Sequence, residues 1–338
     1  MIIITNYWVA IMLCIITMLC WGSWSNTQKM VQGTWRFELY YWDVIIGIML
    51  TSTISAFTIG SMGDVGRDFL TDLKQADTTS ILYAMGGGLL WNAGNLLLVA
   101  AIAIAGMSVA FPIGGGIAWI FGIILNYVNI VMKGGIPSER PLLLWTGILI
   151  IIGAIFLSGK SYSDLEKNKK KQSKKGILIS VLAGIFIAFY YPVTVNSFDA
   201  AFVLGGKGTL TPSTAIFFFS ISVVVSSLLF NSILMRKPVA GPPVNIKQYF
   251  KGSFKVHMAG ILGGVIWTFG LIFSYMAAGV ANPAIAYALG NAAPVAAILW
   301  GIFVWKEFRG APAGTNRLLT IMFIAYLIGL VLITISNA

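Results

Sequence analysis

Ten long, unbroken runs of apolar residues constrain this chain more than any other feature of its sequence. A helix needs roughly 20 mostly apolar residues to cross a bilayer, and each run is about that long. The loops between the runs are too short to contain a soluble domain. We therefore predict an all-α integral membrane protein with ten transmembrane helices. Soluble enzymes and nucleic-acid modules are excluded, as is a β-barrel, whose strands would alternate apolar and polar residues. The runs cover residues 7–28, 40–60, 80–104, 109–132 and 142–158, then 176–197, 214–235, 257–278, 284–305 and 318–336.

Lysine and arginine lie between the apolar runs and give the chain a net charge of +11. In a soluble protein this charge would suggest a nucleic-acid partner, but here it indicates membrane orientation, because cytoplasmic loops are rich in Lys and Arg. With both termini outside the cytoplasm, 17 of the 22 Lys and Arg residues would face it. We predict a multi-pass protein of the cell (inner) membrane in this orientation, with no nucleic-acid partner.

The two halves of the chain resemble each other without gaps when the second is shifted by 176 positions. Gly-Gly-Leu-Leu-Trp, ending at Trp91, then aligns with Gly-Gly-Val-Ile-Trp, ending at Trp267. We predict a first five-helix repeat in residues 1–160, a Lys-rich cytoplasmic linker in 161–175 and a second repeat in 176–338. Because five is odd, the second repeat must be inverted in the membrane. Inverted repeats are recurrent in transporters, whose sites lie near the midplane between the halves.

Proline and glycine occur at corresponding places in the fourth and ninth runs. Pro112 and Gly114 lie in the fourth, and Gly290 and Pro294 lie in the ninth. Both pairs predict helix breaks, where freed backbone groups can line a cavity. Helix packing by small residues is the alternative interpretation.

Amide and aromatic side chains within the runs suggest a site for a small solute. Polar groups inside a membrane are costly unless they are paired or face water. Amides can exchange hydrogen bonds with a neutral solute while indole and phenol rings stack on it. Hydrogen bonding between helices is the alternative interpretation. The candidate solute-binding residues are Trp24, Trp91, Asn92, Asn95, Asn196, Trp267 and Asn291.

Acidic residues are scarce in the runs, and Asp43, with Glu38 just before it, is the acid best placed to enter the membrane. An intramembrane acid is a candidate for carrying a coupling proton or sodium ion. Alternatively, Asp43 is a hydrated acid at the interface or a partner of Arg36. The single histidine, His257, opens the eighth run beside a lysine and is expected to be a hydrated interfacial residue.

Catalytic and cofactor motifs are not found in the sequence. There is no metal-spaced His and Cys cluster, no Walker loop and no pair of facing acids. We therefore predict neither an enzyme nor a cofactor or metal site, and transport that a gradient drives.

Several of these features together resemble the drug/metabolite transporter superfamily. They are the ten runs, the five-plus-five repeat, Cys-Trp-Gly-Ser-Trp at residues 20–24, Gly-Gly-x-x-Trp-Asn-x-Gly-Asn at residues 87–95 and the Lys-rich centre. Within it the chain is most similar to the ureide permeases and the glucose/ribose porters. The resemblance implies secondary active uptake of ureides and nucleobases, or of sugars such as ribose, glucose or rhamnose. The small multidrug exporters are a poorer match, because their first-span Glu has no counterpart here.

The predicted function is uptake of a small neutral polar metabolite by alternating access, coupled to H⁺ or Na⁺. The run centres hold no basic residue to pair with a phosphate and no acid to pair with an organic cation. The residues alone leave sugars and ureides or nucleobases both open, since an amide can bond to either. Efflux of drugs or metabolites is the alternative, and a membrane enzyme or scaffold is a minor one.

Overall fold

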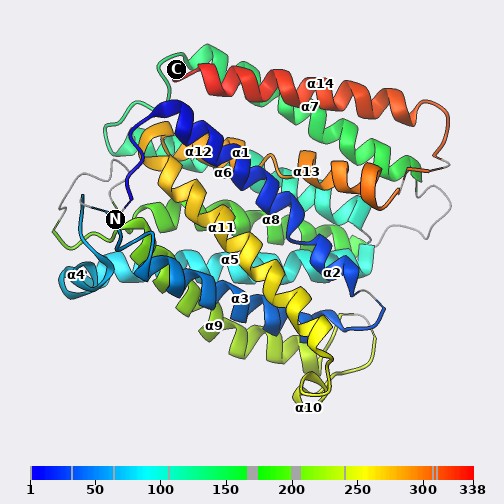
Figure 1. The fold of residues 1–338 in the computed structure, drawn as a ribbon. Helices are drawn as coiled ribbons and strands as arrows, with labels where there is room; N and C mark the ends of the chain where they lie inside the picture. Colours follow the sequence, from blue (N-terminus) through cyan, green and yellow to red (C-terminus); the bar gives the residue numbers. More distant parts are fainter. Residues whose placement is uncertain are drawn as a thin grey trace.

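The structure is a computed structural model that describes residues 2–338 apart from 32, 64, 106, 166–173, 199–206, 240, 307 and 310. In these residues ten spans are long and apolar enough to cross a membrane, and they form one helical bundle (Figure 1). The all-α membrane fold is thus confirmed. The helices are α1 (Tyr7–Ser23), α2 (Asn26–Met30), α3 (Phe37–Phe57), α4 (Phe69–Gln75), α5 (Thr78–Ala105), α6 (Met107–Met132), α7 (Pro141–Leu165), α8 (Lys174–Val195), α9 (Pro212–Arg236), α10 (Ile246–Tyr249), α11 (Phe254–Ala281), α12 (Pro283–Gly290), α13 (Pro294–Leu299), the π-helical turn η1 (Trp300–Val304) and α14 (Thr315–Ile335).

The Asn-Pro pair at residues 282 and 283 separates the eighth span from the ninth. Asn282 has a φ of 64°, and its side chain accepts hydrogen bonds from the backbone N–H groups of Ala284 and Ile285. Pro283 follows as the first helical residue, where no backbone N–H is needed. Two helices therefore meet here with one residue between them.

The ninth span is interrupted where Gly290 and Pro294 predict it, because α12 ends at Gly290 and α13 begins at Pro294. The break predicted near Pro112 and Gly114 is not there, because α6 continues through both residues. Pro112 lies near the start of α6, so its missing N–H removes only a bond to the first helical turn. Helix α5 ends at Ala105 and α6 begins at Met107, and residue 106 lies outside the described part of the chain.

The predicted linker at residues 161–175 is shorter than expected, since α7 extends to Leu165 and α8 begins at Lys174. Its remaining residues, 166–173, lie outside the described part of the chain.

The helix contacts between the two halves come in equivalent pairs. Each contact has a counterpart in which every helix is replaced by the equivalent helix of the other half. The contact of α5 with α8 corresponds to that of α11 with α1, and the contact of α6 with α8 corresponds to that of α12 with α1. Likewise, α3 with α11 corresponds to α9 with α5. This pattern is the one expected of a five-plus-five repeat. The spans α7 and α14 pack together along one side of the bundle (Figure 1).

Glycines allow the closest of these helix crossings. A Cβ at Gly88 on α5 would collide with the backbone carbonyl of Phe219 on α9, and one at Gly264 on α11 would collide with that of Val44 on α3. The two glycines are 176 positions apart. Small residues at such crossings let membrane helices pack backbone to backbone.

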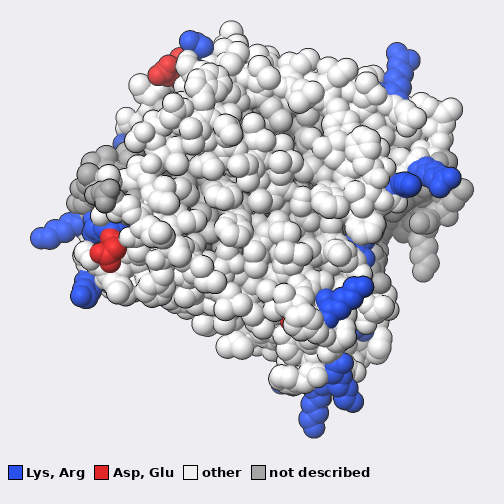
Figure 2. Space-filling model, viewed as in Figure 1, with Lys and Arg blue, Asp and Glu red and all other residues white. Residues whose placement is uncertain are grey.

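Charged residues lie at the two ends of the bundle, and an uncharged band separates them in the face that Figure 2 shows. The N- and C-termini lie at one end together with α4 (Figure 1). We call this the terminal end. The opposite end, which we call the Lys-rich end, holds α2, α10 and the first turns of α8 and α14.

Candidate functional site: a central aromatic cluster and a buried acid

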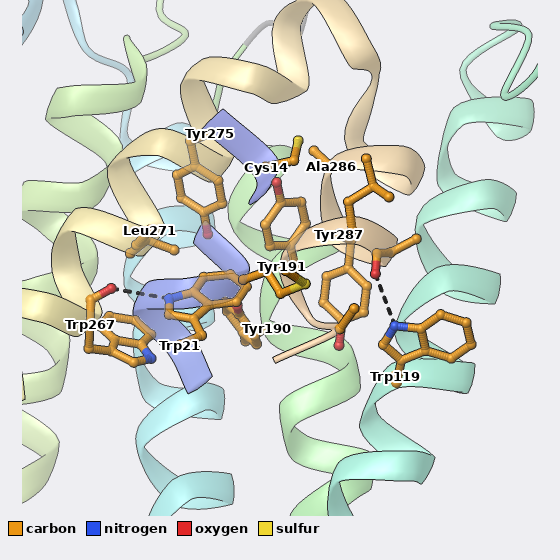
Figure 3. Packing of buried hydrophobic residues seen from close by; sticks show 14 of the residues in the cluster. Cys14, Trp21, Trp119, Tyr190, Tyr191, Trp267, Leu271, Tyr275, Ala286 and Tyr287 are labelled. Carbon is orange, nitrogen blue, oxygen red and sulfur yellow. Dashed lines mark hydrogen bonds between the residues drawn. The ribbon is translucent and has the colours of Figure 1, made fainter. Parts of the chain in front are cut away.

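Four aromatic rings from four helices meet in the centre of the bundle. Trp91 on α5 and Trp267 on α11 have ring centroids 4.0 Å apart, and each is 4% exposed. Trp21 on α1 and Phe219 on α9 stack on Trp267 at 6.2 and 5.8 Å. We call these four residues the central aromatic cluster (Figure 3 shows Trp21 and Trp267).

The cluster lies where the two halves meet. Trp91 and Trp267 lie 176 positions apart, one in each half of the chain, and contact each other directly, so they flank the boundary between the halves. Trp21 donates its Nε1–H to the Trp267 carbonyl oxygen at 3.1 Å. Gly270 makes this approach possible, because a Cβ there would lie 2.6 Å from the Trp21 Nε1.

Buried tyrosines extend the cluster toward the terminal end (Figure 3). The Tyr191 ring on α8 lies 5.0 Å from that of Tyr275 and 5.1 Å from that of Tyr287, and its hydroxyl lies 2.9 Å from Ser274 Oγ. Tyr190 links these rings to Phe219, with centroids 6.1 Å apart. Rings with hydroxyl groups at their edges can stack on a planar solute and bond to its rim.

Asn92 and Asn95, predicted to bind solute beside Trp91, bond instead to neighbouring helices. The Asn92 Oδ1 accepts from the Tyr41 hydroxyl at 2.6 Å, and its Nδ2 donates to Ser226 and Ser227 at 2.7 and 2.9 Å. Asn95 Nδ2 lies 3.3 Å from the Tyr41 hydroxyl. Successive residues of a helix point in directions about 100° apart, so Trp91 faces α11 while Asn92 faces α3 and α9.

The other three predicted solute ligands lie at different depths. Trp24 follows the last residue of α1, toward the Lys-rich end, and Asn196 follows α8 at the terminal end, where its Oδ1 accepts from Asn129 at 3.0 Å. Asn291 lies in the interruption of the ninth span, close to Tyr190, and its Nδ2 donates to the Tyr287 carbonyl oxygen at 3.2 Å. The structure thus brings Asn291 to the aromatic groups and leaves Trp24 and Asn196 apart from them.

Trp21 is a member of the cluster that sequence reasoning did not select. The signal was present, because Ala10, Cys14, Thr17 and Trp21 form a stripe of buried residues spaced three or four apart on α1. Trp24 lies beyond the helix end and does not continue that stripe.

Glycines also bring the broken ninth span against α1. A Cβ at Gly290 would lie 2.8 Å from the Thr17 Cγ2, and the Trp21 ring would be 3.4 Å away. The interrupted backbone and its Asn291 therefore border the cluster. At the corresponding position of α6, Gly114 packs against α8 at Ser180.

Asp43 lies on α3 and is fully buried where α3 packs against α11 near the Lys-rich end. Its Oδ1 accepts from the Tyr249 hydroxyl at 2.5 Å and lies 2.9 Å from His257 Nδ1. Gly260 leaves room for the acid, since a Cβ there would collide with it. His257 is thus the partner of a buried carboxylate and not only an interfacial residue.

Tyr249 reaches Asp43 from α10, the short helix outside the membrane spans. Burial, and then the bond to Asp43, raise the pKa of the Tyr249 hydroxyl above its usual range, so that it remains a donor at neutral pH. Trp35 packs edge-on to His257, with ring centroids 5.4 Å apart. The Asp43 Oδ1 is therefore held by two hydrogen-bonding groups, while its Oδ2 has no hydrogen-bond partner in the described part of the chain.

Glu38, grouped with Asp43 from the sequence, belongs to a different contact. Its carboxylate pairs with Arg36 through two hydrogen bonds of 2.8 and 3.1 Å. Arg36 therefore pairs with Glu38 and not with Asp43. No group of three or more metal-ligating side chains is found in the described part of the chain.

Comparison with known proteins gives one consistent result. A sequence profile described as "Ureide permease" matches residues 40–175 and 162–336. Ureide permease 1 of Arabidopsis thaliana is 25% identical to this chain, and the match covers 97% of each of the two proteins. Ureide permease 4 of the same plant is also 25% identical, over 96% of each. Probable ureide permease A3 of Vigna unguiculata is 24% identical over 85% of this chain and 92% of its own.

A crystal structure of another protein matches the fold with a TM-score of 0.58 and 12% identity. The match covers 98% of this chain and all of the other. At this identity the likeness shows the fold alone.

Proposed function

This chain belongs to the ureide permease family, and we propose from that premise that it takes up a small neutral ureide or a related nucleobase. It is a multi-pass membrane transporter. The observation that carries the substrate proposal is the central aromatic cluster with Asn291 and Tyr190 at its edge. Flat rings can stack on a planar solute, while the amide and hydroxyl bond to its rim.

The charges of the protein interior favour a neutral substrate. Among the described residues, the buried acids each pair with a basic residue outside the central cluster. The pairs are Glu38 with Arg36, Asp43 with His257 and Asp72 with Arg67. A phosphate or an organic cation at the cluster would need an opposite charge there. The names of the relatives favour ureides over the sugars that the residues alone left open.

Alternating access is the proposed mechanism. The equivalent helix contacts of the two halves support an inverted repeat. In such a repeat the two related halves can alternate in closing the opposite ends of the transport pathway. In this conformation Trp91 and Trp267 are buried against each other, so the centre of the bundle is closed to both sides of the membrane. Separation of the halves at this ring pair would expose the cluster to one side or the other.

We place the coupling ion at Asp43, and its neighbours favour a proton over Na⁺. A sodium site needs several oxygen ligands, often backbone carbonyls from unwound helices. Asp43 instead faces a hydroxyl donor from Tyr249 and the imidazole of His257, a group that can hold or release a proton. A proton shared between Asp43 and His257 would change the charge at the contact of α3 with α11.

Counterflow in proteoliposomes tests the function. Vesicles loaded with unlabelled allantoin should take up labelled allantoin, and uracil should compete for entry better than pentoses, hexoses or deoxyhexoses. Trp267→Ala should reduce this exchange at least about tenfold by removing a stacking surface, which is an effect of about 1.4 kcal/mol. Trp8→Ala is the matched control, because Trp8 is 57% exposed on the surface.

Exchange of lipophilic cations but not of ureides, bases or sugars would contradict the proposal and favour efflux. Should Trp267→Ala not fold, Trp21→Phe keeps a ring and removes only the bond to the Trp267 carbonyl.

A further inference from the structure

A cavity of about 180 Å³ lies at the Lys-rich end, apart from the central aromatic cluster. It opens between the first turn of α3, the last turns of α5 and α9, and the loop after α9. Phe37, Val99 and Leu234 form apolar walls, and Arg36 and Glu38 form a charged edge. One water takes roughly 30 Å³ in the liquid, so the cavity has room for a small solute in place of several waters.

The charged edge of this cavity is held in place. Arg36 binds both oxygens of Glu38 and also donates to the Pro242 carbonyl at 2.9 Å. The Glu38 side chain is only 10% exposed. A carboxylate has about four acceptor positions, and Arg36 uses two of them. Glu38 can therefore still accept from a solute in the cavity.

A second acceptor lies behind the residues that line the cavity, next to Glu38. Asn231 on α9 is fully buried, and its Nδ2 donates to the Glu38 carbonyl at 2.9 Å. Its Oδ1 has no hydrogen-bond partner in the described part of the chain. Asn231 precedes Leu234 by three residues, so both lie on one face of α9. A buried acceptor without a donor is costly, and a solute N–H would remove that cost.

A line of neutral polar side chains begins one helical turn deeper on the same three helices. We call this the polar seam, and its members are Tyr41 on α3, Asn92 and Asn95 on α5, and Ser226 and Ser227 on α9. Tyr41 lies four residues beyond Phe37, and Asn95 lies four residues before Val99. The seam therefore leads from the cavity to the level of Trp91, where the central aromatic cluster lies.

We propose that this cavity is a second, peripheral binding site for a neutral solute rich in N–H donors, of the ureide class. Glu38 and Asn231 accept from its N–H groups, and the apolar walls cover its faces. The solute occupies this site on its way between the Lys-rich side and the central aromatic cluster, along the polar seam. The inference rests on the proposed function, because it takes the same solute class.

Equilibrium binding of labelled allantoin to the purified full chain tests the site. The wild type should bind two molecules per chain. Val99→Phe fills the cavity and should reduce this to one, with exchange through the central site reduced but present. Val225→Phe is the matched control on α9, because Val225 is 57% exposed, and it should keep two. Val239→Phe fills the same cavity from the loop if Val99→Phe does not fold.

Asn231→Leu should weaken the peripheral site at least about tenfold while the central site keeps its affinity. One molecule bound by the wild type, with no change in Val99→Phe, would overturn the peripheral site and leave the proposed function intact. No allantoin bound and no counterflow in the wild type would instead overturn the proposed function itself.

Discussion

The Asn92 side chain satisfies its hydrogen-bonding groups within the protein, through Tyr41, Ser226 and Ser227. Asn92→Ala leaves these buried partners without bonds and should lower the free energy of unfolding by about 1–3 kcal/mol. Thermal unfolding in detergent measures this loss, and the central site should keep its affinity for allantoin within about twofold. Loss of binding with an unchanged melting temperature would make Asn92 a direct solute ligand.

Asn291 is expected to behave in the opposite way. It lies in the interruption of the ninth span, where its Nδ2 donates to the Tyr287 carbonyl oxygen at 3.2 Å, and it lies close to Tyr190. Asn291→Ala should weaken allantoin binding about tenfold with a change in melting temperature of only a few degrees. Binding equal to that of the wild type would remove Asn291 from the site.

Asp43 is the residue on which coupling is proposed to depend. Asp43→Asn keeps the size of the side chain and removes its charge, so accumulation against a gradient should be lost while counterflow continues. Labelled allantoin uptake with and without an imposed proton gradient separates the two activities. Asp68→Asn, at an exposed acid outside the membrane spans, is the control, and it should retain gradient-driven accumulation. Accumulation by the Asp43 variant would place the coupling group elsewhere.

Because His257 contacts Asp43, it is expected to influence how uptake depends on pH. If the coupling proton is shared with the His257 imidazole, uptake should depend on pH, and His257→Gln should flatten this pH profile without abolishing exchange. A profile of the variant that matches the wild type would show that His257 only positions Asp43.

At the scale of helices, the crossings of α11 with α3 and of α5 with α9 depend on glycine. Gly264→Ala places a methyl group against the Val44 carbonyl and should cost about 1–3 kcal/mol or prevent assembly. Gly153→Ala on α7 is the matched control, because nothing lies within 4 Å of the added Cβ. Melting temperature and yield of monodisperse protein are the measurements. Equal stability of the two variants would show that the α3 and α11 crossing relaxes easily.

Element boundaries could be predicted where local chemistry alone decides them. Apolar length predicted the ten spans, and Gly290 with Pro294 predicted the interruption within the ninth. Pro112 was misinterpreted, because whether a proline breaks a helix depends on how many residues precede it, and the start of α6 is not visible in the sequence. Capping and length are local properties, whereas helix starts inside apolar runs are not.

At the scale of the whole molecule, the sequence indicated related positions in the two halves but could not assign side chains to faces. The Trp91 and Trp267 match indicated two related positions, and the structure brings those rings together. It could not show that Asn92 turns away from Trp91, or that Asp43 meets Tyr249 and His257 from 206 and 214 residues further along the chain. Those contacts depend on the rotation of each helix about its axis, which packing between helices decides.

The two ends of the bundle differ in charge, and this difference predicts its orientation. The Lys-rich end is expected to face the cytoplasm, because positive loops are retained there, and α4 and both termini are expected to lie outside. A reporter active only outside the cytoplasm should work when fused after Ala338, and one active only in the cytoplasm should work within residues 166–173. The reverse pattern would invert the molecule, and Asp43 and the peripheral cavity would then face the outside. Orientation thus decides from which side the coupling proton and the solute first reach the protein.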